Sequence, residues 1–518
     1  MMHSELDPAL LSHENDGPPS TGSHVGRESK LLLVVSRDPA DNNSDAHGDN
    51  NKIITGILPQ KRSSTLFSMR TFVWLGVLVM AIIFISMIVI VYTKGKTSIQ
   101  GSRDKEDTTS DNTSSTDIFR PGNITIQQMT KKVLFIIADG IPADVIEAAS
   151  APNIRKISDL GTYKRAYVGG IKGSYSETPT VSAPGYMDLI TGTWGNKHNV
   201  FDNDVKNPNY HYKNIFRLLK EQEPQREIGI FSTWLDNRLK LVGEGLPQAG
   251  QIIFDYKFDG YELNQHAYPH DLADYYIYRI DERVANEAAT CIRTAAPDLS
   301  WTYLQYTDDV AHHFGDSEQF NQSVISLDNQ IGRMWEAIEY RQNHFHEDWL
   351  IIITTDHGRD PTTGREHGEQ SDRERTTWIV MNTQNTNDYF RNFQPAIVDL
   401  LPTMAQFLSI SVPIESAREL DGISLIGKIS LANFEAQLTG DRIKFSWQAF
   451  DDEGNVTIWL STTNSFQKGK SDDYQLMGTE HIALKTAEID VKNYPSDFYK
   501  IVLEGRYNMV NKWLFRLT

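Results

Sequence analysis

The stretch from Leu350 to Gln370, LIIITTDHGRDPTTGREHGEQ, places an acid and an imidazole side by side directly after an apolar run. Asp356 and His357 end the run, and His367 follows ten residues later. Carboxylate and imidazole groups are typical ligands of Zn²⁺ and similar divalent ions. We therefore interpret this stretch as part of a metal site.

Two other apolar runs end in the same way. KKVLFIIADG ends at Asp139, and WTYLQYTDDVAHHFG supplies Asp308 and His312. Each residue alone has a structural explanation, because an Asp after a strand often caps a helix and most of the 15 histidines must be structural. If these groups lie together at one place, they predict a site for two divalent ions, of the kind that catalyses phosphoryl transfer.

The elements that must position these groups are buried strands and amphipathic helices. Continuous apolar runs are typical of strands buried on both faces of a parallel sheet. Between two of them, apolar residues recur at the three- and four-residue spacing of a helix face: Val324, Leu327, Ile331, Met334 and Ile338. This alternation predicts an α/β sandwich with a mostly parallel central sheet, in which polar ligands gather beyond the carboxyl ends of the strands.

The order of these motifs resembles the type I phosphodiesterase/nucleotide pyrophosphatase family of the alkaline phosphatase superfamily, over residues 131–427. The family's first metal-binding Asp matches Asp139 in FIIADGI, and PTVSAPGYMDLITG places Ser182 at the nucleophile. HNVFDN points to Asn203 as the residue that holds a phosphoryl oxygen. The family's Asp-x-x-x-His-x-x-Gly and Asp-His-Gly motifs match the segments that begin at Asp308 and Asp356.

The resemblance implies an alkaline-phosphatase-like fold and two divalent metal ions, with Zn²⁺ expected from the ligand types. One ion would be held by Asp139, Ser182, Asp356 and His357, and the other by Asp308, His312 and His367. It further implies a metal-dependent phosphoric-ester hydrolase that forms a phosphoseryl intermediate, with Asn203 donating a hydrogen bond to the developing oxyanion.

Several positions depart from the family pattern and leave alternatives. Ser182 stands where Thr is more common, with Thr180 two residues away, and Asn199 and Ala311 replace glycines. Three rival residues follow from these departures: Thr180 as nucleophile, His313 in place of His312, and His481 in place of His367. The spacing to the following Thr-Gly pair favours Ser182, and the Gly-flanked polar loop favours His367.

The substrate stays open between a nucleotide and a lipid head group, and between a phosphodiester and a phosphomonoester. Nucleotide-cleaving relatives commonly carry an aromatic residue beside the nucleophile, where this chain has Ala183; Tyr186 or Tyr175 are the aromatic alternatives. A sulfatase is a rival because SAPGY fits half of its signature, although Tyr186 replaces the required Arg. A catalytically inactive membrane-bound binding or adhesion protein is a second rival.

The rest of the chain predicts further units around the catalytic domain, which we assign to residues 130–435. Beyond it, alternating apolar residues in RIKFSWQAF and NVTIWL, separated by a turn, predict a hairpin. We therefore expect residues 436–518 to form a β-sandwich similar to a fibronectin type III module. The alternative is a set of extra strands on the main sheet.

The amino-terminal part predicts a membrane anchor. Residues 72–92 contain no charge and are long enough to span a bilayer as a helix. They separate a polar tail, residues 1–70, expected to be disordered and cytoplasmic, from a Ser/Thr/Asp-rich stalk, residues 93–129. Basic residues on the two sides are balanced, but four of five Asn-x-Ser/Thr sites follow the span: Asn112, Asn123, Asn321 and Asn455, against Asn42 before it. We expect a single-pass type II glycoprotein with an extracellular or lumenal catalytic domain.

Composition excludes other classes of function. The net charge of −18 and the absence of a clustered basic surface argue against a nucleic-acid partner. Cys291 is the only cysteine in the chain, so neither an intrachain disulfide nor a cysteine-based metal site is possible. The oligomeric state is not predictable from these features.

Overall fold

The computed structural model describes residues 129–516, and the chain divides into two units at residue 120. The predicted tail, transmembrane helix 72–92 and stalk lie outside the described residues, apart from residue 129. Within the described part, no helix is both long enough and apolar enough to cross a bilayer.

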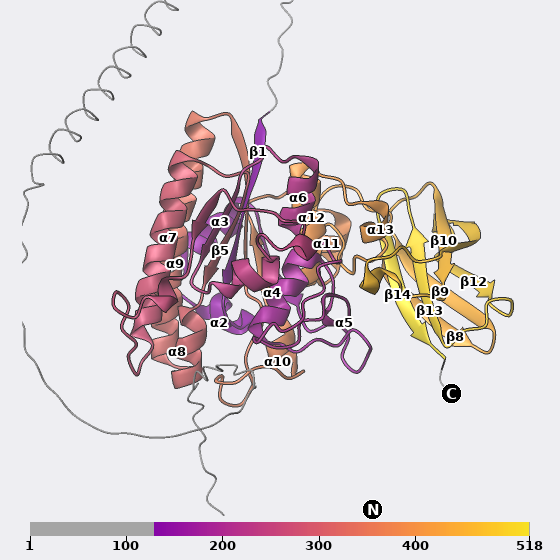
Figure 1. Ribbon diagram of the computed structural model, residues 1–518, viewed down its shortest axis with the longest axis horizontal. Coiled ribbons are helices and arrows are strands. Elements are labelled where there is room, and N and C mark those ends of the chain that lie inside the picture. Colours follow the sequence, from indigo (N-terminus) through magenta and orange to yellow (C-terminus); the bar gives the residue numbers. More distant parts are fainter. Residues whose placement is uncertain (1–128, 517–518) are drawn as a thin grey trace, which may run out of the picture. The chain divides into compact units, whose positions relative to one another are not determined.

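A seven-stranded sheet forms the centre of the catalytic domain (Figure 1). Its strands, in the spatial order β2-β7-β6-β1-β5-β3-β4, are β1 (Thr130–Ala138), β2 (Thr162–Tyr167), β3 (Ile228–Ser232), β4 (Tyr256–Phe258), β5 (Leu299–Leu304), β6 (Glu347–Thr354) and β7 (Thr376–Met381). Strands β6, β1, β5, β3 and β4 are parallel, and β7 pairs antiparallel with both β6 and β2. The mostly parallel sheet agrees with the sequence prediction.

Helices cover both faces of this sheet, as Figure 1 shows. The helices of the domain are α2 (Ala143–Ala148), α3 (Pro152–Leu160), α4 (Ser182–Thr191), α5 (Gly195–His198), α6 (Ile215–Gln222), α7 (Tyr275–Thr294), α8 (Tyr306–Phe314), α9 (Glu318–His344), α10 (Asp372–Arg375), α11 (Asp388–Asn392), α12 (Leu400–Leu408) and α13 (Ile414–Ala417). The predicted helical face belongs to α9, and all five of its apolar residues are buried.

Strand β1 shows why the sheet needs two helical layers. Every residue from Val133 to Ala138 is fully buried. Alternate side chains point to opposite faces of a strand, and the two sets belong to different cores. Val133, Phe135 and Ile137 pack with residues of α4, α6 and α12, whereas Leu134, Ile136 and Ala138 pack with α3, α7 and α9.

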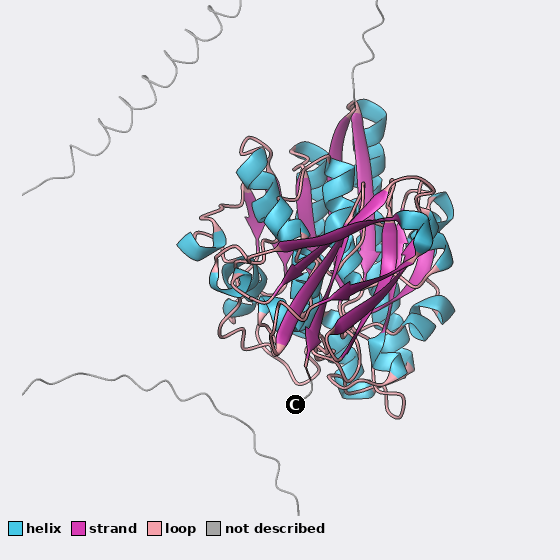
Figure 2. Ribbon diagram, turned by 90° about the vertical axis from the view of Figure 1, so that its right-hand side faces the viewer, coloured by secondary structure: helices cyan, strands magenta, loops and turns pink. Residues whose placement is uncertain are grey.

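Two further sheets form the carboxy-terminal module, whose strands lie in front in Figure 2. One sheet has the order β11-β10-β13-β14 and the other β12-β9-β8. Their bounds are β8 (Leu431–Thr439), β9 (Arg442–Ala449), β10 (Asn455–Ser461), β11 (Gln475–His481), β12 (Thr486–Asp490), β13 (Phe498–Glu504) and β14 (Met509–Phe515). They are separate from the main sheet, and β8 spans the boundary predicted between residues 435 and 436.

The predicted hairpin within this module is wrong. Strand β9 pairs with β8 and β12, whereas β10 pairs with β11 and β13 in the other sheet. The turn after β9 therefore carries the chain from one sheet to the other, so that the apolar faces of both strands are buried between the sheets. The seven-strand division into three and four, together with a hydrogen bond of 2.9 Å from the Tyr499 hydroxyl to the Tyr494 carbonyl, is typical of immunoglobulin-like and fibronectin type III sandwiches.

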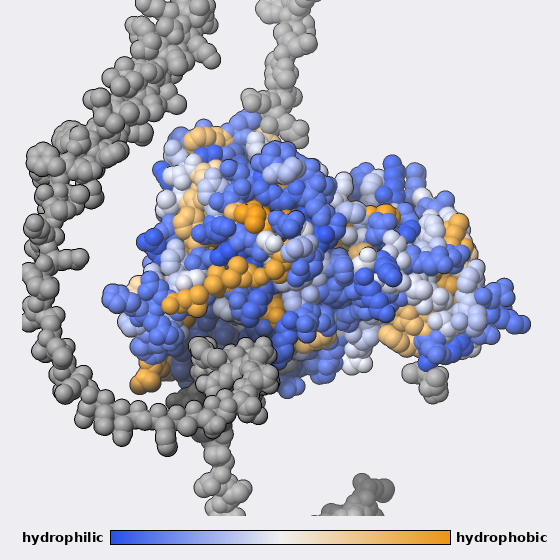
Figure 3. All heavy atoms as spheres, in the orientation of Figure 1, coloured by the Kyte–Doolittle hydropathy of each residue, from blue (hydrophilic) through white to orange (hydrophobic). Residues whose placement is uncertain are grey.

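Most of the surface shown in Figure 3 is hydrophilic, with apolar side chains in small separate patches. Such scattered apolar residues are usual on soluble domains and need no special explanation.

Candidate metal centre and active site

Three adjacent parallel strands bring the predicted acids to one edge of the sheet. Asp139 follows β1, Asp356 follows β6, and Asp308 lies in the first turn of α8, just after β5. Strand β1 lies between the other two in the sheet. Hydrogen bonds from backbone amides to side chains join two of the strand ends. The Gly140 amide donates to Asp356 Oδ1 over 3.1 Å, and the Ile141 amide donates to the Thr355 hydroxyl over 3.0 Å.

Asp139, Asp356 and His357 form the buried half of the site. His357 Nε2 lies 3.4 Å from Asp139 Oδ1 and 3.3 Å from Asp356 Oδ2. His357 Nδ1 lies 2.9 Å from the Gly358 carbonyl and is therefore the donor there, which leaves Nε2 with a free lone pair. All three side chains are almost completely buried.

Ser182 enters this half of the site from the start of α4. Its Oγ lies 3.4 Å from His357 Nε2, and the residue is 7% exposed. The amino-terminal end of a helix carries partial positive charge, which favours negative charge on this oxygen. The neighbouring Ala183 amide donates to Asn203 Oδ1 over 2.9 Å, so Asn203 lies beside the hydroxyl with its amide nitrogen available as a donor.

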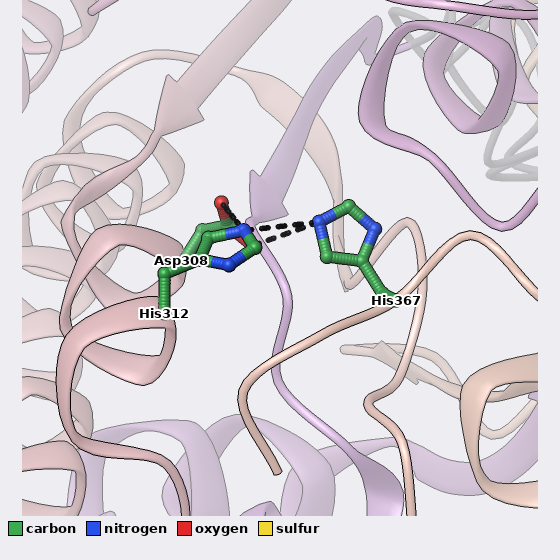
Figure 4. A group of neighbouring side chains, drawn as sticks. All are labelled: Asp308, His312 and His367. Atoms are coloured by element: carbon green, nitrogen blue, oxygen red, sulfur yellow. Dashed lines mark hydrogen bonds and ion pairs between the residues drawn. The ribbon is translucent and has the colours of Figure 1, made fainter. Parts of the chain in front are cut away.

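Asp308, His312 and His367 form the second half, shown in Figure 4. The first two lie on α8, one turn apart, and His367 reaches across from the loop after β6. His312 Nε2 lies 3.3 Å from Asp308 Oδ2 and 3.1 Å from His367 Nε2. These atoms, one from each residue, lie within 4.8 Å of one another, as ligands of one ion must.

The loop that carries His367 is folded back by its own polar groups. The Asp360 carboxylate accepts hydrogen bonds from four backbone amides of the loop. Gly364 takes a positive φ of 67°, which favours glycine because it has no Cβ. His367 Nδ1 lies 2.8 Å from the Thr180 carbonyl, so Nε2 points to the cluster, and its ring stacks on His357 with centroids 3.7 Å apart.

The structure thus brings together every residue that the sequence analysis selected and separates the rivals. The Thr180 hydroxyl donates to the Glu369 carbonyl and accepts from the Gly368 amide, so it is engaged with the backbone of the loop that carries His367. His313 pairs with Asp274 at 2.7 Å. His481 ends β11 in the sandwich, where its ring accepts from the Ala483 amide.

The electrostatics of the site favour bound cations. Burial, and then the neighbouring charges of Asp356 and Asp308, hold the pKa of Asp139 well above its usual range. Burial, followed by the charge of Asp308, raises the pKa of Asp356 to about 7. Asp139 Oδ1 and Asp356 Oδ2 are buried and accept no hydrogen bond. Buried carboxylate oxygens without donors are costly unless a cation compensates them, so the residues present fit a metal ion.

Sequence reasoning missed several groups that support the site. Tyr303 donates to Asp139 Oδ2 over 2.6 Å, and Tyr186 donates to the same oxygen. Tyr186 is therefore buried, with its hydroxyl bonded to Asp139. Tyr175 stacks on Trp513 of the sandwich, with the ring centroids 5.5 Å apart. Neither tyrosine serves as the free aromatic surface suggested from the sequence. Trp234 lines the cleft beside Ser182 instead.

The comparisons with known proteins agree with the motif order. The sequence model of the family described as type I phosphodiesterase / nucleotide pyrophosphatase matches residues 133–423, more than half of the chain. The chain belongs to this family. It is accordingly a hydrolase of the phosphodiesterase/pyrophosphatase superfamily, and its α/β domain has the alkaline-phosphatase-like fold expected from the motifs. No curated protein sequence matches the chain.

Solved structures that match the chain include murine ectonucleotide pyrophosphatase / phosphodiesterase 5 in an inactive form with AMP, which is 13% identical with a TM-score of 0.38. That match covers 55% of this chain and 96% of the murine one. Phosphonate monoester hydrolase of Agrobacterium radiobacter is 14% identical, with a TM-score of 0.40 and coverage of 74% and 89%. A putative sulfatase from Bacteroides thetaiotaomicron is 13% identical, with a TM-score of 0.41 and coverage of 67% and 85%.

Proposed function

We propose that this protein is a metal-dependent phosphoric-ester hydrolase that acts through a phosphoserine at Ser182. The observation that carries the proposal is the convergence of three carboxylates and three imidazoles beside one serine hydroxyl, with Asp139 Oδ1 and Asp356 Oδ2 left without hydrogen-bond donors. A structural cluster would satisfy these oxygens internally. A site that holds cations leaves them open.

Two divalent ions fit the ligand sets. Asp139, Ser182, Asp356 and His357 would hold one ion, because each of the first three places an oxygen within 3.4 Å of His357 Nε2. Asp308, His312 and His367 would hold the other, and Asp308 also lies near Asp139 and His357, between the two positions. Oxygen and imidazole ligands without sulfur suit Zn²⁺, although Mn²⁺ or Fe fit the same types. When bound, such ions lower the pKa of a coordinated hydroxyl and neutralise negative charge on a phosphoryl group.

The reaction on this chain's residues is a pair of displacements. Ser182 Oγ gives up its proton to solvent and attacks phosphorus, the new Oγ–P bond forms, and the ester P–O bond breaks. The departing alkoxide takes up a proton from solvent and leaves as the alcohol. Asn203, held by the Ala183 amide, donates its amide hydrogen to a phosphoryl oxygen as charge develops there. Water then cleaves the phosphoserine and restores Ser182.

The substrate group attached to phosphorus would lie in a cleft of about 700 Å³ beside Ser182. Trp234 offers an aromatic surface in this cleft, while Lys206 and Lys240 at its lining pair with Asp204 over 2.9 Å and with Asp236 over 2.8 Å. These groups suit a nucleotide or a phospholipid head group, both of which combine a phosphate ester with polar substituents.

We further propose a single-pass type II membrane protein with this domain outside the cytoplasm. The apolar stretch at residues 72–92 supports the anchor. Asn321 and Asn455, two of the predicted glycosylation sites, are exposed at the start of α9 and β10. Both are thus accessible to a glycosyltransferase.

The proposal is tested with the full chain purified in detergent. Chromogenic phosphodiester, phosphomonoester and sulfate ester substrates, a nucleotide and a lysophospholipid are each assayed with and without a chelator. We expect chelator-sensitive cleavage of a phosphate ester, at least about 10³-fold slower in Ser182→Ala. The matched control, Ser326→Ala on the surface of α9, should keep wild-type activity.

The contrary results are equally clear. Cleavage of only the sulfate ester would make the protein a sulfatase. Absence of any cleavage by folded, metal-replete protein would support the inactive binding protein instead.

A further inference from the structure

Arg359 is a cation placed inside the metal centre. It follows the Asp-His-Gly segment directly, and it is completely buried. Its guanidinium donates to the Gly140 carbonyl over 3.1 Å, to the Arg365 carbonyl over 2.7 Å and to the Asp308 carbonyl over 3.0 Å. A fourth bond goes to Asp308 Oδ1. An arginine keeps its charge even when buried, so this positive charge is permanent.

The carboxylate of Asp308 is therefore shared. Oδ1 accepts from Arg359, while Oδ2 lies 3.3 Å from His312 Nε2. Oδ1 is also the oxygen 3.8 Å from His367 Nε2. A hydrogen bond to a charged donor reduces the negative charge that the carboxylate can offer to an ion.

The two ion positions consequently differ in charge. Asp139 and Asp356 bring two negative charges to the first position, and no Lys or Arg among residues 129–516 pairs with either carboxylate. At the second position, the single negative charge of Asp308 is balanced by Arg359. A divalent cation is attracted much more strongly to the first set, because the attraction scales with the product of the charges.

Exposure to solvent acts in the same direction. The side chains of Asp356 and His357 are completely buried, whereas the His312 side chain is 37% exposed. Charge interactions are stronger in a buried, low-dielectric site than in one open to water. An ion at the second position also exchanges more readily with solvent.

We propose that Arg359 makes the ion position of Asp308, His312 and His367 the weaker of the two. The inference rests on the proposed function, because both positions belong to that site. One ion stays resident at Asp139, Asp356 and His357. The second position fills only when the free ion concentration is high or when a phosphate group adds negative charge. The protein's activity therefore follows the ambient concentration of the ion.

The test measures metal binding rather than turnover. The full chain, purified in detergent and stripped of metal, is titrated with Zn²⁺ by equilibrium dialysis. For the wild type we expect one tightly bound ion and a second at least tenfold weaker. Arg359→Met removes the charge with little change of length, and we expect it to tighten the second ion at least tenfold.

Two further variants separate charge from position. Arg365→Met makes the same charge change at an exposed side chain of the same loop, and it should leave both affinities within about twofold because solvent screens that charge. Arg359→Lys keeps the positive charge but loses the planar guanidinium group, and we expect the second ion to bind as weakly as in the wild type. If the guanidinium only held the loop in place, both Arg359 variants would bind the second ion more weakly than the wild type. That result would overturn the proposal.

Two measurements on proteins that keep Arg359 make the test independent of whether Arg359→Met folds. His312→Ala should abolish the weak step and retain the tight one, and the opposite pattern overturns the proposal. Two equal affinities in the wild type also overturn it while leaving the proposed function intact. Failure to bind Zn²⁺, Mn²⁺ and Fe²⁺ alike refutes the metal-dependent function itself, so the two failures are distinguishable.

Discussion

Asp139 accepts hydrogen bonds from two tyrosines. Tyr186 and Tyr303 both donate to Oδ2, which leaves Oδ1 directed at His357 Nε2. These bonds lower the pKa of the Asp139 carboxyl, although burial and the charge of Asp356 outweigh them. Groups that orient a metal ligand in this way typically contribute 10- to 100-fold to metal affinity or activity.

Tyr303→Phe tests this support with the loss of one oxygen atom. We expect metal affinity at the first position to fall by about 10- to 100-fold, because Asp139 Oδ2 loses a donor while the ring still packs. Zinc titration by dialysis measures the change. Tyr256→Phe is the matched control, since it removes a hydroxyl bonded to Glu227 at 3.2 Å on β4. Equal effects of the two changes would contradict the account.

The sequence identified the candidate metal ligands but not the residues that orient them. Asp139, Asp308 and Asp356 were predictable because each ends an apolar run and stands in a recognisable motif. Tyr303 lies inside such a run, and only the register that pairs it with Ile137 on β1 places it beside Asp139. The pairing of Arg359 with Asp308 likewise depends on how the loop folds back, which no local pattern encodes.

Helix α4 and strand β6 meet closely at the active site. A Cβ added to Gly185 on α4 would lie 3.0 Å from both the Cβ and the carbonyl oxygen of Asp356. The helix therefore sets the distance between Ser182 and the ligands that follow β6. This closeness explains a glycine in a helix interior, where it usually costs about 1 kcal/mol relative to Ala.

Gly185→Ala should separate the two elements by a few tenths of an ångström and move Asp356. We expect hydrolysis to fall at least tenfold, because catalytic groups tolerate little displacement. Thermal unfolding should change little, since Ala is the better helix former. Gly478→Ala, at a strand position where an added Cβ meets no atom within 4 Å, is the control and should keep full activity.

At this scale the sequence predicted each buried strand and the helix between them, because hydrophobic periodicity is local. It failed at the link between β9 and β10, where the same alternation fits either a hairpin or a crossing between sheets. Pairing partners of strands are long-range, so the pattern alone does not choose between these topologies.

In the whole described unit, the sandwich is joined to the catalytic domain by buried charges. Lys500 on β13 contacts Glu419 at 2.5 Å and Asp472 at 2.6 Å, and all three side chains are at most 2% exposed. Lys197 of α5, equally buried, donates to Asp421 and to the Glu419 carbonyl. The sandwich thereby supports the segment between Ser182 and Asn203.

Lys500→Met should lower the free energy of unfolding by roughly 3–5 kcal/mol, because it leaves two buried carboxylates without their cation. Urea unfolding followed by tryptophan fluorescence measures the loss. Lys512→Met on the adjacent β14 removes a lysine paired with the 70% exposed side chain of Glu435. That control should cost at most about 1 kcal/mol, and a similar cost for both lysines would refute the buried junction.

The central claim is that Ser182 carries the phosphoryl group during turnover. The most direct test mixes metal-replete protein with a phosphate ester that the protein hydrolyses. The reaction is quenched in acid, and the phosphorylated residue is located by mass spectrometry. The account predicts a phosphoserine at residue 182 that disappears when substrate is exhausted and is absent from Ser182→Ala. Steady hydrolysis with no phosphate on Ser182, or with phosphate on another residue, would contradict it.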